Sequence, residues 1–550
     1  MTLQRRSWLA GVGAGAGSGL LGLAGCVREP APPAPWTGGW VGADMARGHG
    51  LRDRSHPAPS SARTRRADVL VVGAGIAGLA AARALMRAGI TDVQVLELED
   101  SAGGNSRGHS MGGLACPLGA HYLPVPGPQA HEVSRWLHEI GVLRTTAGRT
   151  VADERHLCHS PQERLFFDGA WLDGLLPPAA QGSRRQQQYR QFGASVQQAQ
   201  AEIGFALPSH RAGWSAAHQA LDAQPFSQWL DQRGLDDPAL RWYLDYACRD
   251  DYGAGAGTVS AWAGLHYFAS RHGFHAPGDV GDAAAERDAV LTWPEGNAWL
   301  SRRLAEPLGE RLRGASGVWR VSETVHEVQV RALDARSGRD ESWVARAVVM
   351  AVPLFIAARL LQAPPPALAV AAQVMRYAPW LVANLHLDAP LLDRPGGAPP
   401  SWDNVRFGSP TLGYVDATHQ SLRPLPGPTV LTAYWALPES RRKDLSGAAW
   451  RPWGQAFVDD LSVMHPDLPR RLQRIDLMRY GHAMAMPVPG LRSHPALAAL
   501  AAPPAPGSGR VHFAHADLSG YSVFEEAFSH GHRAGSAVAA ALRGGPAPRR

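Results

Sequence analysis

The sequence predicts an α/β fold organised around a dinucleotide-binding strand–helix–strand unit, and three observations within residues 67–97 support this prediction. An apolar run at residues 69–72 leads directly into the glycine motif GAGIAG at residues 73–78. An alanine-rich segment with helical character follows, and a second apolar run ends at Glu97. A dinucleotide-binding unit requires this order of strand, glycine turn, helix, strand and acid.

Each residue of the motif has a distinct physical role. Gly73 allows the tight turn, Gly75 lets the backbone approach a pyrophosphate, and Gly78 lets the helix pack close to the sheet. The unpaired N–H groups at the helix start, around Ile76 and Ala77, favour an anion. Glu97 is placed to accept hydrogen bonds from ribose hydroxyls. The alternative interpretation is a chance glycine-rich turn.

The residues after Glu97 distinguish between the two common dinucleotides. An acidic stretch at residues 97–100 leads into Gly103-Gly104-Asn105-Ser106-Arg107, which resembles the second fingerprint of FAD-dependent amine oxidases and phytoene desaturases. The resemblance implies that Gly104 meets the flavin-side phosphate and that Arg107 contacts phosphate. Gly119-Ala120-His121-Tyr122 resembles the segment that passes the isoalloxazine ring in the same superfamily.

The C-terminal part of the chain carries the partner motif. Residues 510–535 are predicted to form a strand, an acidic turn and a helix, in which Ala527 and Gly531 are spaced for close packing. The resemblance implies that Asp517 contacts the ribityl hydroxyls and that the helix start at Phe524 faces the flavin C2 carbonyl. The chain has Ala-His-Ala-Asp at residues 514–517, where the family has Ala-Gly-Asp or Ala-Gly-Glu.

Two further segments, residues 293–300 and 348–353, resemble those in which the family's chain enters the FAD domain again and leaves it. We also predict that Val325, which lies between them, contacts the cofactor. The resemblance implies a discontinuous FAD-binding Rossmann-like domain of the GR2 type, with an inserted α+β substrate domain. We expect residues 67–145, 293–353 and 491–545 to form the FAD domain. Residues 146–292 and 354–490 are assigned to the substrate domain.

The N-terminal residues are predicted to be an export signal and a tether. Gln4-Arg5-Arg6-Ser7-Trp8-Leu9 is a twin-arginine pattern, and Leu23-Ala24-Gly25-Cys26 resembles a bacterial lipobox. These features predict export to the periplasm or cell envelope, with either a lipid anchor at Cys26 or a cleaved signal without lipid. We expect residues 27–66, which are rich in Pro, Ala, Gly, Ser and Arg, to be a disordered linker.

Charge and cysteine usage limit the partners. The formal net charge is +6, but residues 1–66 account for it and the remainder is neutral, so we predict no nucleic-acid partner. Beyond Cys26 the chain has Cys116, Cys158 and Cys248, which are not spaced as a redox or zinc motif and could form one disulfide. No cysteine follows Cys248, so we expect non-covalent FAD. His530 and His532 have no third ligand in view, and we predict no metal site.

Substrate contacts are predicted from aromatic residues in and near the inserted segments. Tyr521, Tyr122 and Trp435 are candidates for the substrate slot, with core packing as the alternative for each. Several amine oxidases use a lysine to hold a water at flavin N5, and by rough alignment Asn384 occupies that position here. The single lysine of the chain is Lys443, in a hydrophilic stretch.

The sequence therefore predicts an exported FAD-dependent oxidoreductase that resembles amine oxidases and moves hydride from a small amine or amino-acid-like substrate to flavin N5. One alternative is a desaturase or isomerase of an apolar substrate. A second is a non-catalytic FAD-binding envelope protein. Substrate identity, electron acceptor and oligomeric state are left open.

Overall fold

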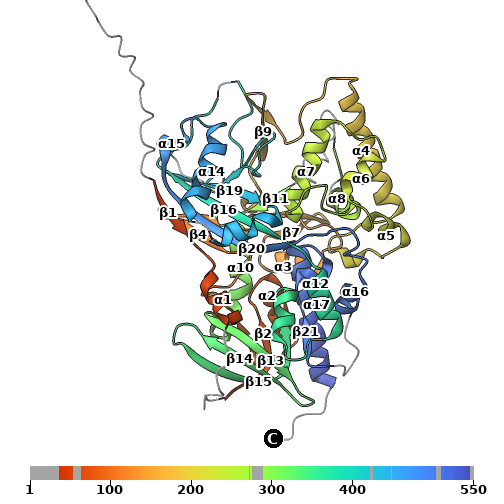
Figure 1. Ribbon diagram of the computed structural model, residues 1–550, viewed down its shortest axis with the longest axis vertical. Helices are drawn as coiled ribbons and strands as arrows, with labels where there is room; N and C mark the ends of the chain where they lie inside the picture. Colours follow the sequence, from red (N-terminus) through yellow and green to blue (C-terminus); the bar gives the residue numbers. More distant parts are fainter. Residues whose placement is uncertain are drawn as a thin grey trace, which may run out of the picture. The chain divides into compact units, whose positions relative to one another are not determined.

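The computed structural model describes residues 36–53, 64–271, 273–275, 289–394, 396–421, 425–447, 449–502 and 509–544, in which helices surround two large β-sheets (Figure 1). The predicted signal and Cys26 lie outside the described residues. None of the helices in this described part is long and apolar enough to cross a membrane.

The glycine motif follows strand β2 (Thr64–Val72) in a seven-stranded sheet of order β12-β3-β2-β15-β14-β13, with β21 beside β15. Strands β2, β3, β15 and β21 are parallel. Residues 69–72 are buried on both faces of this sheet, which explains their continuous apolar run. The other strands are β3 (Val93–Leu96), β12 (Leu312–Arg313), β13 (Ser316–Glu323), β14 (Val328–Asp334), β15 (Arg339–Met350) and β21 (Val511–Phe513).

Helices cover both faces of the seven-stranded sheet. One face carries α2 (Ile76–Arg87), α3 (His131–Glu139), α10 (Ala298–Ala305) and α17 (Phe524–Gly544). Gly531 and Gly535 of α17 lie against the backbone of α2, where a Cβ atom has no room. Gly531 is thus a close-packing residue as predicted, and Gly535 shares this role. Ala527 packs against the same core and also lines a cavity.

The opposite face carries α11 (Leu354–Leu360), α12 (Pro366–Val374) and α16 (Pro495–Ala501). Our assignment of residues 354–374 to the substrate domain was therefore wrong. Leu354, Leu368 and Ala371 are buried in the same core as the strands of the seven-stranded sheet, because α11 follows directly from β15.

The second sheet has eight strands in the order β1-β20-β16-β19-β18-β17-β9-β10 and is mainly antiparallel. Its strands are β1 (Thr37–Trp40), β9 (Glu163–Phe167), β10 (Ala170–Asp173), β16 (Tyr377–Leu387), β17 (Asp403–Arg406), β18 (Tyr414–Asp416), β19 (Thr429–Ala436) and β20 (Leu472–Ala485).

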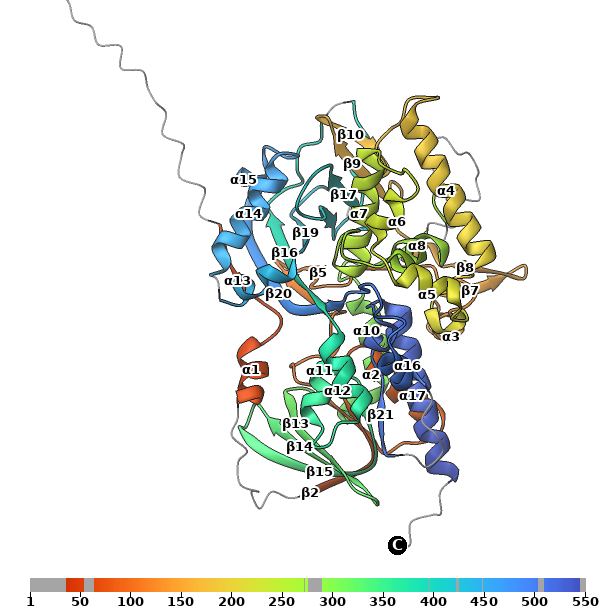
Figure 2. The same cartoon turned by 45° about the vertical axis from the view of Figure 1, so that its right-hand side comes forward.

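The two faces of the eight-stranded sheet meet different partners (Figure 2). One face packs on α13 (Arg442–Gly447), α14 (Trp450–Ser462) and α15 (Leu468–Arg471). The other belongs to the core of a helical layer formed by α4 (Arg184–Glu202), α5 (Ala216–Asp222), α6 (Phe226–Asp231), α7 (Pro238–Tyr252) and α8 (Ala261–Ala269).

Short elements complete the described fold. Two hairpins are β4 (Gly108–Met111) with β5 (Leu114–Pro117), and β7 (Leu143–Thr146) with β8 (Arg149–Ala152). A third antiparallel pair, β6 (Tyr122–Pro124) with β11 (Val290–Thr292), joins strands that are distant in the chain. The 3₁₀ turns are η1 (Glu154–His156), η2 (Ser209–Arg211), η3 (Glu306–Arg311), η4 (Glu439–Arg441) and η5 (Ala516–Ser519). Cys116, Cys158 and Cys248 are free thiols, so no disulfide joins them.

Part of the expected linker is folded, which corrects the prediction for residues 27–66. Residues 37–40 form β1, which pairs in parallel with residues 474–477 of β20. Residues 45–53 form α1 (Met45–Asp53), and residues 64–66 begin β2. The composition of this segment is typical of a disordered linker, but Trp36, which is 4% exposed, packs in the core of the eight-stranded sheet and fixes the segment there.

Candidate functional site

A cavity of about 610 Å³ lies between the two sheets. On one side, the cavity is lined by residues at the carboxyl ends of β2 and β3 in the seven-stranded sheet. Residues in the first turns of α2 and α17, which pack on this sheet, also line it. The eight-stranded sheet contributes residues of β16, β19 and β20. The carboxyl edge of parallel strands is where open α/β sheets bind their ligands.

The glycine motif and its acid form one end of the cavity. Gly73 has φ 99°, in the left-handed region that favours glycine, and its turn brings Gly75 to the cavity wall. Glu97 is 8% exposed, and its two carboxylate oxygens accept hydrogen bonds from the N–H groups of Ala74 (2.7 Å) and Glu99 (2.9 Å). Each of these oxygens keeps a lone pair for a ribose hydroxyl.

Two helices direct their first N–H groups at the cavity. Gly75 is the N-cap of α2 and supplies no side-chain cap, so the N–H groups of Ile76 and Ala77 are available to a phosphate. Phe524 begins α17 and also lines the cavity. Gly78 does not line it, because this residue packs against the Gly73 carbonyl as its predicted role requires.

Two buried oxygens on the cavity wall, Asn297 Oδ1 and Ser316 Oγ, accept no hydrogen bond from a described residue. A third buried oxygen on this wall, Asp517 Oδ1, makes no hydrogen bond either and has only the His515 ring nitrogen nearby, at 3.1 Å. The other oxygen of Asp517 accepts bonds from Leu354 N–H (2.9 Å) and the Tyr377 hydroxyl (2.6 Å), which fix the side chain. Unpaired buried oxygens are costly unless a ligand satisfies them. Together with the glycine cradle, they fit the hydroxyl-rich chain of FAD.

The predicted ring segment lies further along the cavity. Gly104, Gly119, Ala120, His121 and Tyr122 all line it. His121 stacks on Tyr434 with 4.3 Å between ring centroids, and burial lowers the pKa of His121 to about 3, so its imidazole is neutral. Tyr434 donates from its hydroxyl to the Gly119 carbonyl (3.1 Å), which holds this aromatic wall in place.

Carboxylates form another part of the cavity wall, which we call the acidic wall and define as Asp250, Asp251 and Glu525. Asp251 is paired with Arg271 through two contacts of 2.9 and 3.3 Å. Asp250 accepts a hydrogen bond from the Tyr122 hydroxyl (3.3 Å), and burial together with the charge of Asp251 raises the pKa of Asp250 to about 7.

Glu525 completes the acidic wall from the first turn of α17. Glu525 lines the cavity and is 3% exposed, and its carboxylate forms no ion pair with a described residue within 4 Å. Burial raises the pKa of Glu525 to about 7. The acidic wall was not predicted from the sequence. Gly253, in the left-handed conformation, ends α7, so that Asp250 and Asp251 lie in the last turn of this helix.

Two of the predicted substrate contacts, Tyr521 and Trp435, are packing residues. Tyr521 is fully buried, and its hydroxyl donates to Glu526 and not into the cavity. Trp435 faces the other side of its sheet, against Trp453 and Phe457, because side chains alternate along β19 and Tyr434 takes the cavity side.

Asn384 is also buried away from the cavity, where its amide donates to the Pro117 carbonyl (2.9 Å) and its oxygen accepts from Thr432 (2.7 Å). On the same strand, Val382 lines the cavity. Lys443, the single lysine, lies exposed on α13.

Two predicted cofactor contacts are displaced as well. Val325 is 84% exposed at the turn between β13 and β14, far from the cavity lining, and its carbonyl accepts from Arg510. Arg107 does not line the cavity; its guanidinium donates to the Gly104 carbonyl (3.2 Å) and lies 3.8 Å from the Glu99 carboxylate. Arg107 therefore stabilises the Gly103–Gly104 turn from behind.

Known proteins share the sequence pattern of this chain. The model of the family described as flavin containing amine oxidoreductase matches residues 76–539. A flavin-containing amine oxidase of Oncorhynchus mykiss is 26% identical over 289 residues, which cover 52% of this chain and 50% of that protein. Putrescine oxidase of Kocuria rosea is 30% identical over 173 residues, 31% of this chain and 32% of its own length. The matches thus span half or less of these relatives.

Solved structures share the fold. Putrescine oxidase with bound putrescine superposes with a TM-score of 0.64 at 19% identity, covering 88% of this chain and 100% of its own. Cyclohexylamine oxidase from Brevibacterium oxydans gives 0.64 at 18% identity, with 87% and 99% covered. A fatty acid isomerase from P. acnes gives 0.55 at 15% identity, with 85% and 97% covered. Given the family match over most of its length, this chain belongs to the flavin containing amine oxidoreductase family and is an FAD-dependent oxidoreductase.

Proposed function

We propose that this enzyme oxidises a small amine or amino-acid-like substrate that arrives as an ammonium ion. The residues around the cavity would form a discontinuous Rossmann-like FAD domain with an inserted substrate domain. Gly73, Gly75 and Glu97 would hold the ADP half, and Asp517 the ribityl chain. When bound, FAD supplies the acceptor for the hydride on the carbon beside nitrogen.

The observation that carries this proposal is Glu525. Burial disfavours the charge on this carboxylate more than its own N–H and the charge of Arg271 favour it, and a cation in the cavity would compensate the difference. Asp250 adds a second carboxylate to the same cavity, whereas Arg271 is already neutralised by Asp251. The described wall therefore favours a positively charged ligand and repels an anionic one.

Asp250 also has the chemistry to prepare the substrate. An amine must lose its ammonium proton before the adjacent C–H bond can donate a hydride. The proton would pass from the ammonium nitrogen to the Asp250 carboxylate, which leaves a neutral amine and a neutral carboxylic acid. A carboxyl group with its pKa near 7 accepts such a proton more readily than an ordinary aspartate.

A desaturase or isomerase of an apolar substrate is the competing function. The apolar side chains of Val382 and Ile356 on the cavity wall, and the fold of the fatty acid isomerase, favour it. The acidic wall disfavours it, because a fatty acid carboxylate would face Asp250 and Glu525. The position of Lys443 outside the cavity supports an electron acceptor other than oxygen.

Anaerobic reduction of the flavin tests the choice of substrate. The purified yellow protein is mixed with a panel of amines, amino acids, polyenes and fatty acids, and flavin absorbance is followed. We expect bleaching by one or more amines and none by fatty acids. Bleaching by an apolar substrate alone would refute the amine proposal.

We also propose export by the twin-arginine route, with acylation at Cys26. The support is the Arg5-Arg6 pattern and the lipobox-like residues 23–26. Replacing both arginines by lysine should leave the protein in the cytoplasmic fraction, and Cys26→Ser should abolish incorporation of labelled fatty acid. Unchanged fractionation of the first variant would exclude this route.

A further inference from the structure

The folded part of the N-terminal segment, residues 36–53, crosses from one sheet to the other beside the FAD cavity, and we call it the N-terminal arm. Its first half belongs to the eight-stranded sheet, through β1 and the contact of Trp36 with Trp450 (5.5 Å between centroids). Its second half, α1, lies beside β13 of the seven-stranded sheet. Figures 1 and 2 both show α1 between the two sheets.

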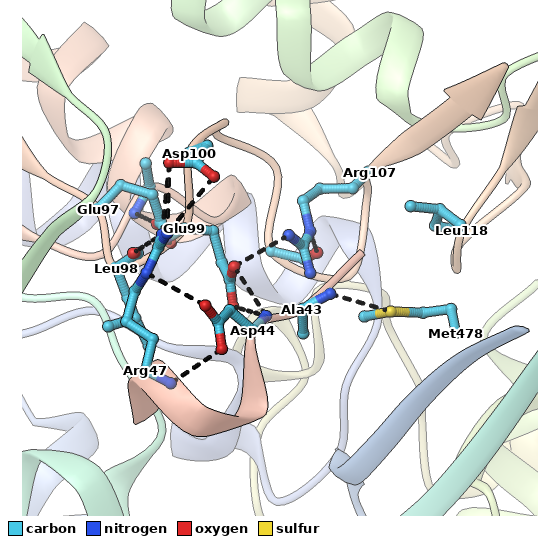
Figure 3. Close-up of polar contacts among 12 residues, drawn as sticks. Ala43, Asp44, Arg47, Glu97, Leu98, Glu99, Asp100, Arg107, Leu118 and Met478 are labelled. Atoms are coloured by element: carbon cyan, nitrogen blue, oxygen red, sulfur yellow. Dashed lines mark hydrogen bonds and ion pairs between the residues drawn. The ribbon is translucent and has the colours of Figure 1, made fainter. Parts of the chain in front are cut away.

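The arm makes several polar contacts with the residues that follow Glu97 (Figure 3). The N–H of Asp44 donates to both carboxylate oxygens of Glu99, each at 3.2 Å. The guanidinium of Arg47 donates to the Leu98 carbonyl (2.8 Å) and lies 3.4 Å from the Asp100 carboxylate. On the other side, the N–H of Ala43 contacts Met478 of β20 at 3.3 Å.

One of the contacted residues, Leu98, lines the nucleotide end of the cavity next to Glu97. Gly48 of the arm itself also lines it, and a Cβ there would approach the Leu98 side chain at 3.8 Å. Glu99 is shared between the arm and Arg107, which supports the Gly103–Gly104 turn. The arm thus lies at the end where the ribose and adenine of FAD would lie, and it holds Glu99, whose N–H donates to the Glu97 carboxylate.

We propose that the N-terminal arm is a clasp that retains FAD, and that Arg47 is the positioning residue that fastens the clasp to residues 98–100. FAD could leave only after the arm detached from this segment. Loss of the Arg47 contacts would therefore accelerate FAD release. The contacts of Arg47 do not include residues of the ring end of the cavity, so that end would be unaffected.

The test compares Arg47→Ala with a matched control. Arg241→Ala removes a guanidinium that likewise bonds a backbone carbonyl, of Leu235, and a carboxylate, of Asp231 at 2.6 Å, but lies away from the cavity. We expect Arg47→Ala to release FAD about tenfold faster than wild type on dilution, equivalent to about 1.4 kcal/mol. Arg241→Ala should match wild type. Equal rates for all three proteins would overturn the proposal.

A second pair of measurements separates a clasp from a general structural role. Affinities of the flavin-stripped full-length protein are measured for FAD and for FMN, which lacks the adenosine. Arg47→Ala should weaken FAD binding about tenfold and leave FMN binding unchanged. An equal loss for both flavins would show that Arg47 acts only through overall stability, and would refute the clasp.

A variant in the opposite direction is available in α1. A Cβ at Gly50 would meet no atom within 4 Å, and alanine favours a helix over glycine. Gly50→Ala should therefore slow FAD release. A faster release from Gly50→Ala would contradict the proposal.

Discussion

Two adjacent glutamates at the start of α17 should respond in opposite ways to the same substitution. Glu526 is fully buried and accepts hydrogen bonds from the N–H of Ser209 and the hydroxyls of Ser519 and Tyr521. Although burial opposes its ionisation, His530 and these donors hold the pKa of Glu526 at about 2. Its neighbour Glu525 has no such donors, and burial raises its pKa to about 7.

The magnitude follows from the Glu526 pKa. A fall from 4.5 to about 2 corresponds to roughly 3 kcal/mol of stability, at 1.36 kcal/mol per pH unit. This contribution is fully present above pH 4.5 and is lost as the pH falls towards 2, because the folded state binds the proton more weakly. Loss of one partner in a buried charged network costs about 3–5 kcal/mol, which agrees. Glu526→Gln should therefore lose about 3 kcal/mol at pH 8.

Glu525→Gln should behave differently. A raised pKa means that the folded state disfavours the carboxylate above pH 7, so a neutral glutamine removes a cost. This variant should melt no lower than wild type at pH 8, while amine binding weakens. Melting followed by flavin fluorescence at pH 8 measures both variants. If Glu525→Gln were as destabilising as Glu526→Gln, the assignment of one structural and one functional glutamate would be refuted.

Three further predictions concern the cavity. The kcat/KM for an amine should rise with pH through about 7 as Asp250 ionises. Asp250→Asn should remove this rise and lower kcat/KM about 100-fold, since a hydrogen bond to a charge contributes about 1.5–3 kcal/mol. An unchanged pH profile in the variant would exclude Asp250 as the group that accepts the proton. Gly75→Ala should fold but purify without FAD, because its Cβ would meet only Gly104 Cα, at 4.0 Å, and would occupy the phosphate site. Gly78→Ala should instead lower the melting temperature, because its Cβ would collide with the Gly73 carbonyl. Flavin absorbance and thermal melting distinguish the two variants, and a yellow Gly75→Ala protein would contradict the placement of the phosphates. Tyr434→Leu should raise KM at least tenfold, while Trp435→Leu should cost about 2–3 kcal/mol of stability with KM unchanged. Steady-state kinetics and thermal melting check both variants. A change in KM for Trp435→Leu would contradict the assignment of Tyr434, and not Trp435, to the cavity side of β19.

Local chemistry made the nucleotide end of the cavity predictable from sequence. The φ of Gly73, the packing of Gly78 and the position of Glu97 all follow from residues close together in the chain. This motif sets its geometry within about 30 residues. Residues 119–122 and Asp517 also line the cavity, but Asp517 is held there by Leu354 and Tyr377, which are distant in the chain.

The substrate end was not predictable in this way. Trp435 and Tyr434 are equal candidates by composition, and only the register of β19 against its neighbours decides which one faces the cavity. Tyr521 and Glu525 are four residues apart, yet one is enclosed in packing and the other is exposed to the cavity.

The sequence by itself thus determined the fold class, the cofactor and the nucleotide-binding turn, because these are local patterns of glycine, apolar and acidic residues. Tertiary structure decided the acidic wall, which joins Asp250 of α7 to Glu525 of α17, and the N-terminal arm, which meets residues about 50 and 430 positions away. The physical reason is that burial and pairing set the charge and accessibility of a side chain, and both depend on segments that only the folded chain brings together.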